Sequence, residues 1–303
     1  MPQTAFQTSD GVDLCVEDTG PADAPVTVLL AHGWTSDNRV WDAVFPRLAE
    51  RVRVVRFDHR GHGSSGHAPD PAIDRLGDDL AELIEALAPA GRLVLVGHSM
   101  GGMAMMALAA RHPDLVRSRA HAAFFVSTSS GRMREITFGL PRPVAKAGQA
   151  LMREQGKRRA RRAASVEAAP ASPAPKPPRK PSPLQLRAQR AFLRWLLFGA
   201  PFQRADLLSV ADQLGVVHGR SAAALRSSIN RHEAAEAVRV YRDVPTQVLT
   251  GARDRLIPAE HSRAIAAELP DAELVVYHAA GHMLPYERAD DLVARILTAA
   301  GRA

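Results

Sequence analysis

The chain has 303 residues and an ordinary globular composition, which suits one large α/β domain or two smaller domains. Its formal net charge of +7 arises in one segment, 153–183, which holds nine Lys and Arg and two Glu; the remaining chain is neutral, so the charge does not indicate a nucleic-acid-binding fold. The single cysteine, Cys15, excludes an internal disulfide and a thiolate metal cluster.

The sequence also predicts where the protein is found. Residues 1–14 include Asp10 and Asp13 and no long apolar run, so we expect neither a secretory signal nor a transit peptide. No window contains the roughly 18 consecutive apolar residues that a membrane-spanning helix needs. Together with the lone cysteine, these features predict a cytoplasmic protein without a membrane span.

Strands and helices alternate through the first part of the chain. Apolar runs predict strands at 12–17, 26–31, 52–57, 93–96 and 120–127, and helical spacing of apolar residues predicts helices at 41–51, 73–87 and 103–111. The run at 26–31 is almost continuously apolar, which is typical of a strand covered on both faces. This alternation predicts a parallel sheet with helices on both faces.

The alternation stops at Gly131 and returns near residue 243. The intervening pattern predicts helices at 144–163, 184–198, 202–215 and 222–240, and after it come strands at 245–249 and 273–277 and helices at 259–269 and 289–299. We therefore predict a first core segment at 1–130, an inserted helical lid at 131–242 and a second core segment at 243–303. The returning pattern makes the two core segments one domain.

The lid contains a basic, proline-rich insert at 153–183. Seven prolines from Pro170 to Pro183 exclude a helix or a central strand, so this part is expected to be extended or disordered. The basic run at 157–162 could bind nucleic acid or acidic lipid. A solvated loop with no dedicated partner is the favoured interpretation, so we expect no nucleic-acid partner.

The motif Gly-x-Ser-x-Gly occupies 97–101, between a predicted strand and a predicted helix. Flanking positions almost free of side chain let strand and helix approach in a sharp turn, which lifts the Ser99 hydroxyl clear of the backbone. The Met100 N–H then lies at the positive end of a helix, where negative charge developing on a substrate oxygen is stabilised. The motif therefore predicts Ser99 as a nucleophile.

A serine nucleophile needs an imidazole base, which a carboxylate orients in turn. In this order of elements the acid follows a later strand and the histidine follows a still later one, both at the same edge of the sheet. Asp254 follows the strand predicted at 245–249, and His282 follows the strand predicted at 273–277. We therefore predict the catalytic triad Ser99, Asp254 and His282.

The predicted oxyanion hole consists of two backbone N–H groups aimed at one point. Met100 supplies one of them. Trp34, on the loop after the strand at 26–31, is expected to supply the second while its indole lines the pocket. The preceding Gly33 lets the backbone turn over the carboxyl edge of the sheet, where open α/β sheets bind ligands.

Five segments together resemble the capped branch of the α/β-hydrolase superfamily. They are His-Gly-Trp at 32–34, Asp-His-Arg-Gly-His-Gly-Ser-Ser at 58–65, Gly-His-Ser-Met-Gly-Gly at 97–102, Gly-Ala-Arg-Asp at 251–254 and Gly-His at 281–282. The resemblance covers 10–130 and 243–300 and does not extend to the lid. It implies the α/β-hydrolase fold with a mainly parallel eight-stranded sheet, a Ser-Asp-His triad and no cofactor.

The remaining polar residues of these motifs are given structural roles. His98 is interpreted as a packing residue rather than a base, and His32 and Asp58 as residues that anchor loops by hydrogen bonds. His59 and His62 do not complete a metal ligand set with their neighbours, so no metal is expected.

The lid has more aromatic side chains than one helix stripe needs, so part of this surface is expected to roof an apolar acyl pocket. The predicted substrate contacts are Trp34, Met100, Trp195, Phe198 and Met283. The sequence shows no obvious carboxylate clamp or pyrophosphate cradle. We therefore expect an uncharged or weakly polar ester of medium size, rather than a phosphorylated or CoA-bound substrate.

The predicted activity is hydrolysis of a carboxylic ester through an acyl-enzyme. The same triad could also serve a cofactor-free haloperoxidase, a perhydrolase or a lactonase, because this scaffold hosts many reactions. Alternatives of another class are a ligand-binding signalling protein that keeps a hydrolase pocket, and a nucleic-acid or membrane adaptor that acts through the basic insert. The natural substrate and the oligomeric state do not follow from the sequence.

Overall fold

The computed structural model describes residues 3–20, 23–68, 71–138 and 182–301. Within these ranges eight strands form one sheet in the order β1-β2-β4-β3-β5-β6-β7-β8. The strands are β1 (Thr4–Gln7), β2 (Asp13–Thr19), β3 (Val26–Ala31), β4 (Arg53–Phe57), β5 (Arg92–His98), β6 (Ala120–Val126), β7 (Thr246–Gly251) and β8 (Glu273–Tyr277). The pairs β1–β2 and β2–β4 are antiparallel and the others are parallel, which confirms the predicted mainly parallel eight-stranded sheet.

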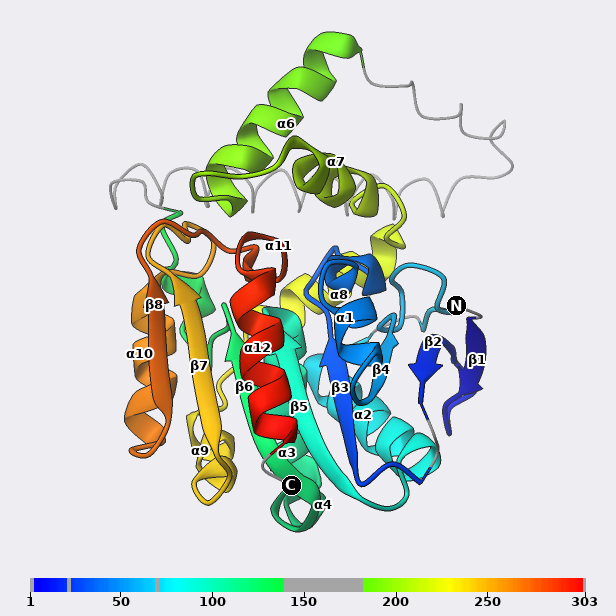
Figure 1. Ribbon diagram of the computed structural model, residues 1–303. Coiled ribbons are helices and arrows are strands. Elements are labelled where there is room, and N and C mark those ends of the chain that lie inside the picture. Colours follow the sequence, from blue (N-terminus) through cyan, green and yellow to red (C-terminus); the bar gives the residue numbers. More distant parts are fainter. Residues whose placement is uncertain (1–2, 21–22, 69–70, 139–181, 302–303) are drawn as a thin grey trace, which may run out of the picture.

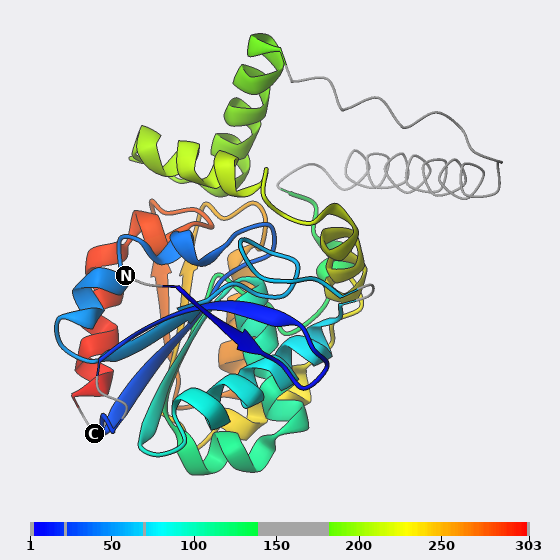
Figure 2. The same cartoon turned by 90° about the vertical axis from the view of Figure 1, so that its right-hand side faces the viewer.

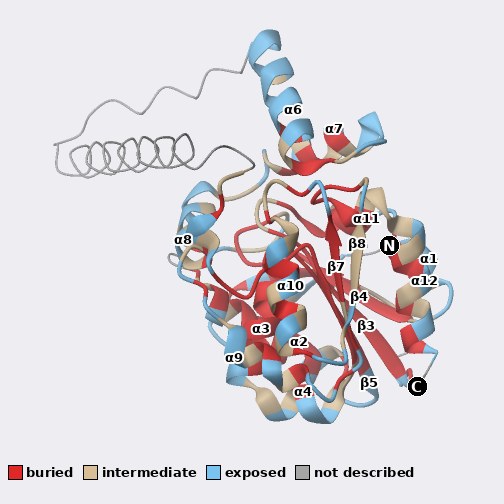
Figure 3. Cartoon of the chain, turned by 90° about the vertical axis from the view of Figure 1, so that its left-hand side faces the viewer, coloured by how far each residue is buried: buried red, intermediate tan, exposed pale blue. Residues whose placement is uncertain are grey.

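Helices cover both faces of this sheet (Figures 1 and 3). One face carries α1 (Phe45–Ala49) and α12 (Ala289–Ala300), and the other carries α2 (Ile73–Leu87), α3 (Met100–Arg111), α4 (Pro113–Arg119) and α10 (Ala259–Glu268). Apolar side chains of each strand alternate between two core clusters, because successive residues of a strand point to opposite faces. In β3, Val28 and Leu30 join the cluster of α1 and α12, and Leu29 joins the cluster of α2 and α3.

The parallel strands end at a common edge. Gly97 of β5 lies opposite Ala31 of β3 and Phe125 of β6, and Gly251 of β7 lies opposite Tyr277 of β8. Loops that leave the carboxyl ends of parallel strands meet at such an edge. The loops after β3, β5, β7 and β8 carry the predicted site.

The structure corrects one predicted helix and adds one strand. The helix predicted at 41–51 is a short 3-10 helix, η1 (Asn38–Trp41), followed by α1, because Pro46 suits the first turn of a helix and interrupts one that runs through it. The edge strand β1 was not predicted; it pairs with β2, which corresponds to the strand expected at 12–17.

The helix predicted at 222–240 is also two helices, α8 (Gly219–Ile229) and α9 (Ala235–Val238). Between them the Ala234 N–H donates to the Ser130 carbonyl at 2.7 Å instead of continuing the helix ladder. This tertiary hydrogen bond turns the chain before η3 (Arg239–Tyr241) leads back to the sheet.

Helices α6 (Pro183–Leu197) and α7 (Arg204–Gln213) come between β6 and β7 in the chain, although these two strands are neighbours in the sheet. Both lie beyond the carboxyl edge of the parallel strands (Figure 1), and α6 extends away from the sheet (Figure 2). Leu193 and Leu197 of α6 are buried, while most of its other residues are exposed (Figure 3). These helices agree with the inserted helical lid; its boundaries at 131 and 242 remain predictions.

The helix predicted at 144–163 and the basic insert as far as Pro181 lie outside the described residues. None of the described helices is both long and apolar enough to cross a bilayer.

The Gly-rich loop at 58–65 is held by a buried ion pair. Arg60 Nε lies 2.7 Å from Asp79 Oδ2, Arg60 Nη2 lies 2.6 Å from Asp79 Oδ1, and both side chains are 1 % exposed. Burial raises the pKa of the Asp79 carboxyl. Without Arg60, the one remaining ion pair of Asp79 among the described residues would be the contact with Arg75 at 3.2 Å.

The variant Arg60→Ala is therefore expected to lose about 3–5 kcal/mol of unfolding free energy at neutral pH, since it leaves a buried carboxylate poorly compensated. Because the pKa of Asp79 is raised in the folded state, the folded protein binds more protons at this carboxyl than the unfolded chain does as the pH falls. The loss of unfolding free energy in Arg60→Ala should therefore become smaller as the pH falls towards the folded-state pKa of Asp79. Urea unfolding at pH 7 and at about pH 5 measures both effects. The control Arg47→Ala breaks the exposed pair with Asp290 and should cost less than about 1 kcal/mol; equal losses would contradict the prediction.

Candidate active site

Ser99 lies at the junction of β5 and α3, with φ 53° and ψ −116°. A positive φ is uncommon for a residue other than glycine and persists where the surroundings enforce it. Here the Ser99 N–H donates to the Val126 carbonyl at 2.9 Å, and the Ser99 carbonyl accepts from Thr128 Oγ1 at 2.6 Å. Strand β6 and its following loop thus hold the sharp turn that the motif predicts.

The glycines of the motif are required by close backbone approach. A Cβ on Gly97 would lie 2.5 Å from the Gly102 nitrogen, and a Cβ on Gly101 would lie 2.2 Å from the Ala31 carbonyl oxygen. Both distances are far shorter than a van der Waals contact, so a side chain at either position would push β5, α3 and β3 apart.

Asp254 and His282 are joined by a buried hydrogen bond. His282 Nδ1 lies 2.7 Å from Asp254 Oδ2, and the two residues are 3 % and 5 % exposed. The other carboxylate oxygen, Oδ1, accepts from the N–H groups of Leu256 at 2.9 Å and Ile257 at 2.8 Å. These two donors fix the orientation of the carboxylate, which in turn fixes the orientation of the imidazole.

The loop that carries His282 is held by hydrogen bonds to the end of α6 and to Glu287. The His282 N–H donates to the Leu197 carbonyl at 2.7 Å, and the Gly281 N–H donates to both carboxylate oxygens of Glu287 at 3.0 Å. Helix α6 therefore takes part in placing the imidazole, which the sequence did not indicate.

His98 connects the Ser99 turn to the His282 loop. Its Nε2–H donates to the His282 carbonyl at 3.0 Å, and the two rings lie 4.9 Å apart. A Cβ on Gly33 would lie 3.1 Å from both His98 Nδ1 and Ser99 Cβ, so the loop after β3 lies against the same turn. Within the described residues no hydrogen bond joins the Ser99 hydroxyl to the His282 ring; a catalytic contact of this kind commonly tightens when substrate binds.

We expect His98→Ala to lower kcat by about tenfold, because it leaves a buried carbonyl of the His282 loop without a donor, a loss of about 1–3 kcal/mol. Burial keeps the pKa of His98 well below its ordinary value, so the ring acts as a neutral donor. The variant His98→Gln, which retains an N–H donor, should recover part of the loss. Steady-state kinetics beside thermal unfolding test this; equal kcat in the Ala variant and the wild type would contradict it.

The predicted oxyanion donors, Trp34 and Met100, lie on the loop after β3 and at the start of α3. Among the hydrogen bonds of the described residues, none uses the backbone N–H of Trp34 or of Met100 as donor. The indole of Trp34 is turned towards α8, where Nε1 donates to the Ala222 carbonyl at 3.0 Å and the Arg226 guanidinium lies 5.0 Å from the ring centroid. Among the described residues the Trp34 N–H is thus without an acceptor, while the Trp34 carbonyl accepts from Thr35 Oγ1 at 2.7 Å and the indole is anchored.

Comparison with known proteins fits this geometry. A model of the alpha/beta hydrolase family matches residues 28–296. A pimeloyl-acyl-carrier-protein methyl ester esterase of Chromobacterium violaceum is 32% identical over 84% of this chain and 86% of its own length. The chain belongs to the alpha/beta hydrolase family.

Other similarities cover less of the sequence or show the fold alone. A bifunctional esterase/perhydrolase of Acinetobacter calcoaceticus is 43% identical over 35% of this chain and 39% of that protein. Two further curated relatives are matched over 36% and 33% of their length, so the chain covers well under two thirds of these three. An esterase from Exiguobacterium antarcticum has a TM-score of 0.74 at 17% identity, over 97% of this chain and 98% of that one.

The loop anchors predicted for this hydrolase are confirmed. His32 Nε2 accepts from the His59 N–H at 2.9 Å, and Asp58 accepts from the N–H groups of Asn38 at 2.7 Å and Ser64 at 2.9 Å. Burial lowers the pKa of His32 to about 4, so the ring is a neutral acceptor at pH 7. These contacts join the loops after β3 and β4 under the predicted oxyanion donors.

The predicted substrate contacts differ in how far their side chains are exposed. Met100, Phe198 and Met283 are buried in the two core clusters, whereas Trp195 is 37% exposed on α6. Trp195 and Phe198 line a common hollow whose described lining does not include Ser99, Trp34 or Met100. Their role as substrate contacts remains a prediction.

The hollow beside Trp195 also contains residues that the sequence did not indicate. Arg194 on α6 and Arg253 and Arg255 on the loop after β7 line it together. The sequence showed no obvious carboxylate clamp, and this group of arginines was not among the predicted site residues. Arg194 is distant in sequence from Arg253 and Arg255, so only the packing of α6 against the sheet edge could show that the three line one hollow.

Proposed function

We propose that this chain is a serine hydrolase that cleaves a carboxylic ester through an acyl-enzyme intermediate. The observation that carries the proposal is the buried hydrogen bond between Asp254 and His282, at the sheet edge that also bears the strained Ser99. The N–H groups of Trp34 and Met100, which have no acceptor among the described residues, support it. Similarity to a methyl ester esterase over most of both chains supports an ester substrate.

In the proposed reaction Ser99 Oγ attacks the carbonyl carbon and His282 Nε2 accepts its proton. Asp254 accepts from His282 Nδ1–H, which leaves Nε2 free as the acceptor, and its charge stabilises the imidazolium that forms. The N–H groups of Trp34 and Met100 bind the oxygen as it becomes negative. His282 then protonates the leaving alcohol, and water hydrolyses the acyl-enzyme by the same route.

A fluorophosphonate probe tests the assignment, because it reacts with an activated serine. We expect one probe per chain on the peptide that contains Ser99, with multiple turnovers of a short-chain nitrophenyl ester before inhibition. Labelling of a different serine would contradict the proposal. Labelling at Ser99 without turnover would favour a ligand-binding protein that keeps a hydrolase pocket.

A perhydrolase is the second candidate, because a bifunctional esterase/perhydrolase is 43% identical over 109 residues. In that reaction the same triad transfers the acyl group of a carboxylic acid to hydrogen peroxide, which gives a peracid and water. Bromination that depends on acetate and peroxide measures this activity. Bromination that disappears in Ser99→Ala would support perhydrolase activity. Absence of bromination would contradict it, and ester hydrolysis would then be the one proposed activity.

A cytoplasmic location and a small-molecule ester as partner complete the proposal. The lone Cys15 is buried, and burial raises the pKa of its thiol to about 11, so it is an unreactive core residue. A chain that relies on no disulfide suits a reducing compartment.

A further inference from the structure

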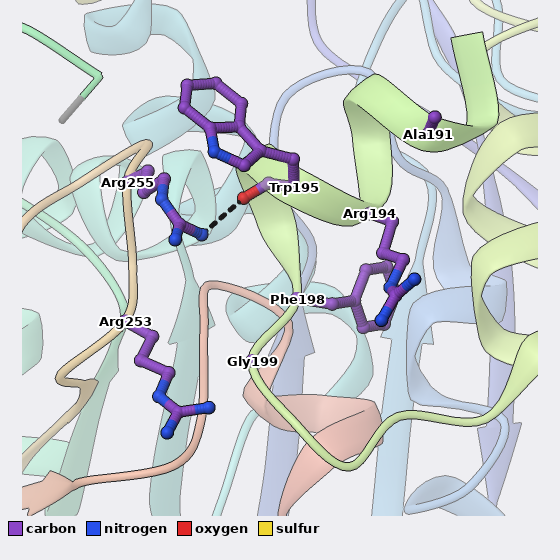
Figure 4. A pocket seen from close by; sticks show the side chains of 7 residues that line it. All are labelled: Ala191, Arg194, Trp195, Phe198, Gly199, Arg253 and Arg255. Carbon is purple, nitrogen blue, oxygen red and sulfur yellow. Dashed lines mark hydrogen bonds between the residues drawn. The ribbon is translucent and has the colours of Figure 1, made fainter. Parts of the chain in front are cut away.

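A hollow of about 350 Å³ lies between the end of α6 and the loop after β7 (Figure 4). Its described lining consists of Ala191, Arg194, Trp195, Phe198, Gly199, Arg253 and Arg255. None of these residues belongs to the proposed triad or to the proposed oxyanion hole. The volume is within the range of sites that take small organic ligands, about 300–1,000 Å³.

Three guanidinium groups border this hollow without a described counter-charge. No Asp or Glu is among its described lining residues, and the ion pairs of the described residues do not include Arg194, Arg253 or Arg255. Figure 4 shows Arg194 on one side of the Phe198–Gly199 segment and the other two arginines on the opposite side. An anion in this hollow would be attracted by positive charge from two sides, with no acidic side chain in the described lining to compete.

Two of the guanidinium groups are held in place by aromatic rings. Arg255 Nη1 donates to the Trp195 carbonyl at 2.6 Å, and its guanidinium lies 5.2 Å from the Trp195 ring centroid. The Arg194 guanidinium lies 4.6 Å from the ring centroid of Phe202. Stacking of this kind restrains a guanidinium while leaving N–H groups available, so less ordering is needed when a ligand binds.

A neighbouring hollow of about 410 Å³ provides a contrast. It shares Arg253 and Arg255, but Asp254 and Glu260 are also among its lining residues. These carboxylates offset the positive charge there. The hollow beside Trp195 is therefore the one whose described lining is cationic and aromatic without acidic groups.

We propose that this hollow binds an organic carboxylate that carries an alkyl or aromatic group. The planar guanidinium fork matches the two oxygens of a carboxylate, and Trp195, Phe198 and Ala191 offer apolar surface for the attached group. The proposal goes beyond ester hydrolysis, because binding requires no reaction at Ser99.

Titration of the wild-type protein with octanoate, followed by tryptophan fluorescence at low ionic strength, tests the proposal. We expect a saturable change that disappears in Trp195→Phe, because Trp195 lines the hollow. Arg253→Gln and Arg194→Gln should each weaken binding by about fivefold, the upper limit for one exposed ion pair. The matched control Arg187→Gln, an exposed arginine on α6 outside the hollow, should leave the dissociation constant unchanged.

Two other ligands test whether the hollow recognises both the carboxylate and the alkyl chain of octanoate. Octanamide has the same chain without charge and should bind more weakly, and added salt should weaken octanoate binding because exposed charges are screened. Equal binding of octanamide, or of inorganic phosphate, would overturn the assignment to an amphiphilic carboxylate. Octanoate binding that is unchanged in both hollow variants, or weakened equally by Arg187→Gln, would show that the ligand does not occupy this hollow.

Discussion

Replacing Ser99 with alanine is expected to lower kcat/KM for a short-chain nitrophenyl ester by about 10⁴- to 10⁶-fold, because the proposed nucleophile is lost and only binding and the oxyanion donors remain. The described residues form no hydrogen bond with the Ser99 hydroxyl, and alanine occupies the same backbone conformation at equal cost. Unfolding free energy should therefore change by less than about 0.5 kcal/mol. Steady-state kinetics and urea unfolding provide the two measurements.

The matched control is Ser118→Ala. Ser118 is exposed on α4, where its hydroxyl donates to the Asp114 carbonyl within the same helix. This variant should hydrolyse the ester at the wild-type rate. Retention of more than a few per cent of activity by Ser99→Ala, with the control unchanged, would end the assignment of Ser99 as nucleophile.

Asp254→Asn is expected to lower kcat by about 10⁴-fold while leaving the fold intact. The N–H groups of Leu256 and Ile257 require an acceptor, so the amide oxygen of asparagine would take the place of Oδ1. The amide NH2 would then face His282 Nδ1, which must accept a hydrogen bond. The imidazole proton would move to Nε2, and the ring could no longer accept the proton of Ser99.

The control for this variant is Asp271→Asn, which makes the same change at an exposed residue between α10 and β8. It should leave kcat unaltered. Similar kcat values for Asp254→Asn and the wild type would show that the carboxylate does not set the tautomer of His282, even if Ser99 remains essential.

Many of the helices and strands were predictable, because the apolar pattern and the turn residues that define them lie within a short stretch of sequence. The helices at 73–87 and 289–299 and the strand at 273–277 follow from apolar periodicity and short turn segments, and the structure has them within one residue of these bounds. Misplaced boundaries have a local cause at Pro46, which interrupts the helix predicted at 41–51, and a tertiary cause at Ala234. The hydrogen bond from Ala234 to Ser130 divides a helix that has the correct spacing throughout.

The three residues of the proposed triad could be predicted from the sequence, whereas the contacts that position them could not. Ser99, Asp254 and His282 could be proposed because each follows a strand, and the carboxyl ends of parallel strands share one edge. The hydrogen bond from His98 to the His282 carbonyl joins residues that are 184 positions apart in the chain. No local pattern indicates such a contact.

The sequence by itself determined the order of strands and helices, the sharp turn at Ser99 and the candidates for its acid and base, because periodicity and turn chemistry act between near neighbours in the chain. Only the tertiary structure decided how α6 closes on the His282 loop and that Arg194 meets Arg253 and Arg255 around one hollow. The reason is physical: the position of α6 depends on which of its apolar residues find partners on the sheet edge, and those partners are distant in sequence.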